Sequence, residues 1–211
     1  MAGTATATPS ETTSVPHGTD EERKGPPKPQ LEGEAKLRRF LRGYVAAQLR
    51  SKGHYDLAVI VERETKRLMP SSLDEDEVAE VLTRMADKLN EERSEQFEHM
   101  CVQLNLSQTN TRRKFNKVMT NLFQENITWG NIVTLVTFTG HIATYCARYN
   151  MDEQSIEVLN EADTYLHEQL LPWILEQGGW VSLSLCIYKR ARQAVLRTYI
   201  GACLELTVWS G

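Results

Sequence analysis

The sequence predicts an all-α domain, and three observations lead to this prediction. Residues 128–149 are apolar on nearly every side over a helical length, so other helices must enclose this segment. Several flanking segments repeat apolar residues at spacings of three and four. No stretch alternates apolar and polar residues over a useful length, which argues against strands. We therefore expect amphipathic helices packed around one buried central helix.

The composition is typical of one globular domain in a reducing compartment. The chain has 211 residues and a net charge of −4, which is enough for a real core and unlike a basic nucleic-acid binder. The N-terminus lacks the pattern of a secretory signal or transit peptide, which favours the cytoplasm. The cysteines show no metal-ligand spacing, so we expect reduced, buried thiols and neither a metal nor a cofactor. They are Cys101, Cys146, Cys186 and Cys203.

The chain divides into three parts. Residues 1–31 hold five of the seven prolines and few large apolar side chains, so we expect a disordered Thr/Pro-rich tail. Residues 32–190 form the predicted helical domain. Residues 191–211 are expected to be a closing helix or a degenerate membrane anchor, because charged side chains are costly near the centre of a bilayer. The charged residues there are Arg192, Arg197 and Glu205.

The first helix is predicted over residues 34–51, ending near Gly53, and residues 56–69 are read as loop or short helix before Pro70. The apolar face of the first helix comprises Leu37, Phe40, Leu41, Tyr44, Val45 and Leu49, and the cations Lys36, Arg38, Arg39 and Arg42 are expected opposite.

Ser72 and Glu75 form a capping box that predicts the start of a second amphipathic helix. Its core-facing stripe has the order Leu-x-x-Met-Ala-Asp-x-Leu, which offers apolar knobs for a groove, a small residue for close approach and a carboxylate for a basic partner. An ordinary core-facing helix would have the same spacing, so both interpretations stand. The residues concerned are Val78, Leu82, Met85, Ala86, Asp87 and Leu89.

Two further helices are expected before the central one, a short helix over 97–104 and a clearer one over 115–123, with a polar turn at 107–111. Thr128 is placed to cap the central helix.

Asn150 can adopt the left-handed conformation that ends the central helix. Asn150 and Glu153 would form a second capping box for the next helix, which we expect to end at Pro172. Gly178 and Gly179 then break the chain.

Four segments resemble the homology motifs of the Bcl-2 family of apoptosis regulators, in the family's order. Thr-Trp-Gly-Asn at 128–131 is similar to the first motif, and Gly-Gly-Trp at 178–180 to the second. Residues 82–89 resemble the third, which is called BH3, and residues 36–49 the fourth. The residues that carry the first two motifs are Thr128, Trp129, Gly130, Asn131, Gly178, Gly179 and Trp180.

The resemblance implies a helical bundle around a buried hydrophobic hairpin, residues 128–171, with a groove that receives an amphipathic BH3 helix. Binding of an amphipathic helix in a groove is a general mode of peptide recognition, and this family is an example of it. For this chain, the expectation of such a groove follows from the resemblance. A groove floor is chemically a core left partly open, so a simple core role is the alternative for each residue. The implied groove residues are Phe97, Met100, Val118, Met119, Leu122, Gly130, Asn131, Thr134 and Phe138.

Asn131 departs from the family pattern. Family members typically carry an arginine here, which pairs with the acidic residue of the incoming helix. A neutral amide cannot make that bidentate charged pair. For a pair partly exposed at a groove mouth, the loss would cost about 1–2 kcal/mol, so we expect altered ligand choice and an intact groove.

We find no enzyme signature, and His141 is read as a satisfied core histidine, so we expect no catalysis. The leading hypothesis is a prosurvival regulator that sequesters BH3 helices. The alternative is a Bak- or Bok-like effector that permeabilises the mitochondrial outer membrane, because both classes share one fold. A divergent module whose groove has lost BH3 binding is a third reading. Expected partners are BH3-containing family members or a second copy of the chain, with conditional contact with the mitochondrial outer membrane and no nucleic acid.

The variant Asn131→Arg tests whether the asparagine at this position alters ligand binding. If the missing arginine weakens or redirects ligand choice, the variant should change affinity for at least one BH3 peptide in a fluorescence-anisotropy titration, by about 1–2 kcal/mol. Unchanged affinity for every BH3 peptide tried would contradict this expectation.

Overall fold

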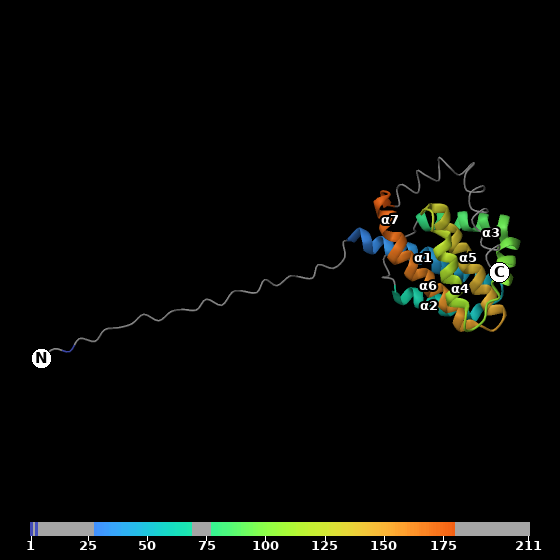
Figure 1. The fold of residues 1–211 in the computed structure, drawn as a ribbon, viewed down its shortest axis with the longest axis horizontal. Helices are drawn as coiled ribbons and strands as arrows, with labels where there is room; N and C mark the ends of the chain where they lie inside the picture. The colour runs from blue at the N-terminus through green and yellow to red at the C-terminus, as the bar shows by residue number, and fades with distance from the viewer. Residues whose placement is uncertain (2, 4–27, 69–76, 180–211) are drawn as a thin grey trace.

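The computed structural model describes residues 1, 3, 28–68 and 77–179, and the described part is helical with no strand (Figure 1). The all-α prediction is confirmed. The helices are α1 (Lys28–Ser51), α2 (Tyr55–Leu68), α3 (Glu77–Leu104), α4 (Thr111–Leu122), α5 (Trp129–Arg148), α6 (Asp152–Tyr165), the π-helical turn η1 (Leu166–Leu170) and α7 (Leu171–Glu176).

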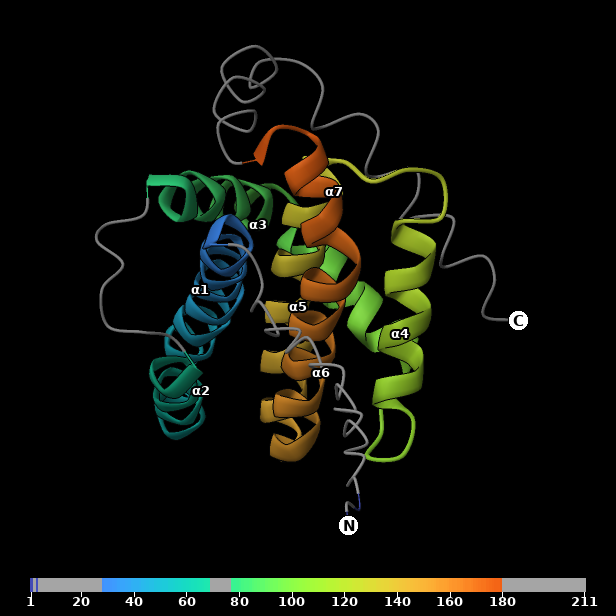
Figure 2. The same ribbon diagram turned by 90° about the vertical axis from the view of Figure 1, so that its left-hand side faces the viewer.

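Helix α5 lies at the centre of the bundle. Every residue of α5 except Tyr145 and Arg148 is buried, and the helix packs against α1, α3, α4 and α6. Figure 2 shows α1 and α2 on one side of α5 and α6, and α4 on the other. Asn150 takes the expected left-handed conformation, with φ of 57°, and turns the chain from α5 into α6. The buried central hairpin is therefore confirmed.

Polar groups inside α5 find partners within the bundle. The hydroxyls of Thr137, Thr139 and Thr144 each donate to the backbone carbonyl four residues earlier, at 2.9, 2.7 and 2.9 Å. Ser155 of α6 donates to the carbonyl of Ala143 at 2.9 Å. Burial of these hydroxyls is tolerated because each has a hydrogen-bond acceptor.

His141 occupies the buried interface between α3 and α5. Its Nε2 lies 2.6 Å from Oδ1 of Asn90, and its ring centroid lies 5.0 Å from that of Phe97. Desolvation lowers the pKa of His141 to about 4. The role of a satisfied core histidine is confirmed, because the neutral ring is partnered and enclosed.

The close contact of α1 with α5 depends on Gly140. A Cβ at this position would lie 3.2 Å from side-chain atoms of both Tyr44 and Gln48. The predicted apolar face of α1 is buried as expected. The absence of a side chain at Gly140 therefore lets the two helices approach each other.

Arg42 corrects one expectation for α1. It was expected on the polar face, but it is only 3 % exposed. Its Nε donates to Asp163 of α6 at 3.0 Å, and its Nη2 donates to Asn160 at 2.8 Å. Nη1 lies 3.5 Å from a carboxylate oxygen of Glu64 on α2, and Arg38 also reaches Asp163 at 3.1 Å. Helices α2 and α6 cover this face of α1 and supply the counter-charges.

Helix α2 resolves the ambiguity over residues 56–69 in favour of a helix of 14 residues. Leu57, Ala58 and Val61 are buried, and α2 packs against α1. At the solvent side, Arg50 makes a bidentate pair with Glu62 at 2.7 and 2.8 Å. Three apolar contacts spaced for one helical face therefore outweigh the weak overall periodicity of the segment.

Two predicted helix boundaries were wrong. The short helix at 97–104 is the end of α3, because the intervening residues are mostly good helix formers and contain neither Gly nor Pro. Asn150 and Glu153 do not form a capping box, since Met151 precedes α6 and no side chain caps that helix. Asn150 is instead used to end α5.

The predicted stop at Pro172 was also wrong. The chain passes through the wider π-helical turn η1, and Pro172 falls in the first turn of α7, where its missing N–H is tolerated. The break at Gly178 and Gly179 is confirmed, with φ of 90° and 67°. The capping box of Ser72 and Glu75 lies outside the described residues.

Removing the buried cation should destabilise the fold. Arg42→Met leaves Asp163 buried, 8 % exposed, with only Arg38 as a charged partner, and breaking a buried pair costs roughly 3–5 kcal/mol. Chemical denaturation measures this change. Arg50→Met removes an exposed pair and is the matched control, expected to cost under about 1 kcal/mol. Equal losses in the two variants would contradict the assignment.

His141 should make stability depend on pH. Its folded pKa is depressed to about 4 from 6.5, so its contribution is fully present above pH 6.5 and is lost as the pH falls towards 4. The size is of the order of 3 kcal/mol. In urea titrations at several pH values, His141→Gln should flatten the pH dependence in this window. An unchanged slope would rule out His141 as its source.

Candidate functional site

The implied groove residues come together from three helices. Phe97 and Met100 lie on α3, which packs on α5, whereas α3 and α4 make little contact with each other. The rings of Phe97 and Phe138 lie 5.7 Å apart. The remaining members are Val118, Met119 and Leu122 on α4, and Gly130, Asn131 and Thr134 on α5. We call these nine residues the α3–α4 seam.

The seam is closed in this structure. All nine residues are buried, with exposed fractions between 2 % for Phe138 and 9 % for Met100 among those with side chains. Sequence reasoning could not separate a groove floor from a core, and here the residues lie in the core. In this state their burial keeps a ligand helix from contacting them directly.

Asn131 lies inside the bundle and joins the end of α4 to the start of α5. Thr128 accepts a hydrogen bond from the backbone N–H of Asn131 at 3.2 Å, the cap that the sequence predicted. The side-chain amide of Asn131 donates to the carbonyl of Leu122, and its Oδ1 accepts from the hydroxyl of Thr128. Asn131 is 8 % exposed, so the structure corrects the assumption of a partly exposed groove mouth.

This burial changes how Asn131→Arg must be read. An arginine at this position would remove the bond to the Leu122 carbonyl and place a charge in a buried site. Affinities measured for the variant therefore report ligand choice only where circular dichroism shows that the variant is folded.

The chain's own BH3-like motif is part of the closed bundle. Leu82 and Ala86 are buried, and the hydroxyl of Tyr44 on α1 donates to the carbonyl of Ala86 at 3.4 Å. Partial desolvation, with Glu91 nearby, raises the pKa of the exposed Asp87 above its usual range. Met85 and Leu89 are partly buried, whereas the side chain of Val78 lies outside the description.

The first tryptophan motif and the glycines of the second lie at the end of the bundle that contains the start of α5 and the end of α7. The ring of Trp129 packs edge-on against Trp173, at 5.6 Å and 66°. The sequence analysis did not identify Trp173 as a partner of the first motif. The feature that could have indicated this role is its position directly after Pro172 in an otherwise apolar segment. Trp180 lies outside the described residues, so the second motif is described only at its glycines.

The described part of the chain contains buried thiols and no cluster of metal-ligating side chains. Cys101 and Cys146 are buried and free, and burial raises the pKa of both thiols, that of Cys146 to about 12. Within residues 28–68 and 77–179, no group of three His, Cys, Asp or Glu side chains could hold a metal ion. Cys186 and Cys203 lie outside the described ranges.

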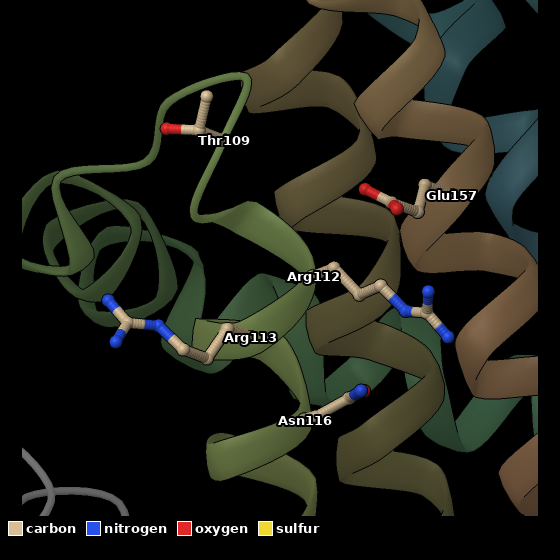
Figure 3. A pocket seen from close by; sticks show the side chains of 5 residues that line it. All are labelled: Thr109, Arg112, Arg113, Asn116 and Glu157. Carbon is tan, nitrogen blue, oxygen red and sulfur yellow. The ribbon is translucent and has the colours of Figure 1, made fainter.

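An open hollow of about 490 Å³ lies between α4 and α6 (Figure 3). It is lined by Thr109, Arg112, Arg113, Asn116 and Glu157. Figure 3 shows the Arg113 side chain pointing away from Glu157. No residue predicted for the functional site lines this hollow, so it does not contribute to the candidate groove.

The curated relatives include proteins of both functional classes. Residues 82–180 match the family described as "Apoptosis regulator proteins, Bcl-2 family". The chain is 26 % identical over 114 residues to the Bcl-2-related ovarian killer protein of Gallus gallus, which covers 53 % of this chain and 54 % of that protein. It is 30 % identical over 122 residues to the human Bcl-2 homologous antagonist/killer, covering 57 % of each. Human Bcl-2-like protein 1 is 28 % identical over 103 residues, covering 49 % and 44 %.

These matches span about half the length of the curated relatives, whereas the likeness to solved structures is more extensive. The crystal structure of chicken BOK has a TM-score of 0.57 at 21 % identity, covering 77 % of this chain and 99 % of that one. The structure of Trichoplax adhaerens trBcl-2L2 bound to trBak BH3 has a TM-score of 0.58 at 23 % identity, covering 74 % and 97 %. The fold and the sequence match agree, and residues 82–180 of this chain form a domain of the Bcl-2 family.

Proposed function

We propose that this protein regulates apoptosis by capturing the BH3 helix of a pro-death relative in the α3–α4 seam. The observation that carries the proposal is the gathering of apolar side chains from α3 and α4 on α5, without close packing of α3 on α4. An amphipathic helix with apolar residues at spacings of three and four fits such a surface. The structure of the Trichoplax relative with a Bak BH3 segment supports the same class of partner.

Capture requires the seam to open. Because residues such as Phe97 and Met119 are buried in the free protein, the apparent affinity is reduced by the small fraction of open molecules. Burial of each large apolar knob of the ligand contributes about 1.5–3 kcal/mol, which offsets the cost of opening. The seam is thus closed in the free protein and becomes a groove when the ligand binds.

The enclosure of the BH3-like motif supports the sequestering class. Leu82 and Ala86 are buried against the protein's own bundle, so the motif is not presented to other molecules in this state. A protein that binds BH3 helices without releasing its own needs this arrangement. His141 and Arg148 also interrupt the apolar surface of α5, which disfavours insertion of the central hairpin into lipid.

A Bak- or Bok-like effector is the second candidate, favoured by the relatives named ovarian killer and antagonist/killer. In that function α3 would leave the bundle and expose residues 82–89. A module that has lost BH3 binding is the third reading, suggested by Asn131. No function as an enzyme is proposed.

We propose a cytoplasmic protein with conditional contact with the mitochondrial outer membrane. None of the helices in the described ranges is long and apolar enough to cross a bilayer. The proposed anchor-like segment 191–211 and the tail 1–31 fall almost entirely outside those ranges. BH3-containing relatives are the proposed partners, with a second copy of the chain as a further one.

A combined binding and release experiment separates the candidates. A fluorescent Bak BH3 peptide is titrated into the full chain, and dye release is followed from liposomes of mitochondrial outer-membrane composition, with and without the peptide. The sequestering function predicts saturable binding without release. The control peptide carries Glu in place of its central leucine and should bind at least tenfold more weakly, because it loses an apolar knob and buries a charge.

The other outcomes identify the alternatives. Peptide-triggered release would overturn the sequestering function in favour of the effector. Neither binding nor release would favour the module without BH3 binding, and the fold would stand.

A further inference from the structure

Arg93 is an incompletely partnered cation on α3. Its side chain is partly buried, and its Nε is enclosed without a hydrogen-bond partner. Among the described residues, the guanidinium has one hydrogen-bond partner, Gln96, whose Oε1 accepts from Nη1 at 3.3 Å. Among the ion pairs of the described residues, none includes Arg93. A desolvated N–H without an acceptor is costly, and a ligand that supplies an acceptor would relieve this cost.

Arg93 shares a helix face with the α3 members of the seam. Phe97 follows it by four residues and Met100 by seven, so the three side chains follow one another along one side of α3. Phe97 on this face packs against Phe138 of α5. Asn90 lies three residues before Arg93 on α3, and its side chain contacts His141 of α5. The face that carries Arg93 is therefore directed towards α5.

The cation that the family pattern supplies at position 131 is absent here. The Asn131 amide is neutral and already bonded to the Leu122 carbonyl and the Thr128 hydroxyl. On α4, Arg112 pairs with Glu161 at 2.7 Å, and Lys114 donates to the carbonyls of Leu104 and Asn105. Arg93 has no such competing acceptor apart from Gln96.

We propose that Arg93 binds the carboxylate of the incoming helix and so sets ligand specificity, an inference that rests on the proposed function. The preferred ligand is an amphipathic helix with an aspartate beside a small residue, as in the chain's own Ala86 and Asp87. The guanidinium Nε–H is already desolvated in the free protein, so the carboxylate gains a charge-assisted hydrogen bond without that further cost.

A double-mutant cycle tests the pairing. Anisotropy titrations combine the unaltered protein and Arg93→Met with the Bak BH3 peptide and with the same peptide carrying Asn for its aspartate. Methionine keeps the apolar stem and removes the charge. Each single change should weaken binding roughly tenfold to a hundredfold, whereas the two together should cost little more than either one. Arg84→Met, an exposed arginine on the opposite side of α3, is the control and should change nothing.

The outcomes are distinct. If Arg93→Met weakens both peptides equally, or neither, the pairing is overturned while the groove function stands. If the unaltered protein binds neither peptide, both proposals fail. Thermal unfolding adds a second readout, because removal of an unpaired buried N–H should leave stability unchanged or higher. A drop in stability would indicate a structural role and overturn the assignment.

Discussion

The enclosure of α5 is the constraint on which the rest of this structure depends. A helix of 20 residues with almost no polar face cannot exist in water unless other helices cover it. Helices α1, α3 and α6 therefore each bring an apolar stripe to α5, and Gly140 lets α1 come close. The polar groups left inside, such as Thr137 and His141, are tolerated because each has a partner.

Local pattern predicted the fold class, the buried central helix, the Thr128 cap and the apolar face of α1, because these depend on spacing within one segment. It could not predict the burial of Arg42, since the partners Asp163 and Glu64 come from distant helices. The continuity of α3 was missed because a polar stretch looks like a boundary, although helix formers continue through it.

For the candidate site too, the sequence indicated which residues take part but not how they pack. Its residues were found by resemblance to family motifs, and the roles assigned to them stay proposals. Whether they form a groove or a core depends on how the helices pack in three dimensions, which the spacing of residues within one segment does not encode. The unpartnered Nε of Arg93 was likewise invisible in the sequence, because Arg93 falls in a charged stretch where most side chains face solvent.

The hydrogen bond from Tyr44 to the Ala86 carbonyl joins the BH3-like motif to α1, and Arg42 and Arg38 join α1 to α6. Detachment of the motif would therefore strain a connected set of three helices, because α1 contacts both of its neighbours at once. The opening of α3 and the loosening of α1 become thermodynamically coupled events. Any signal that weakens the hold of α6 on α1 would, by the same coupling, make the BH3-like motif easier to release.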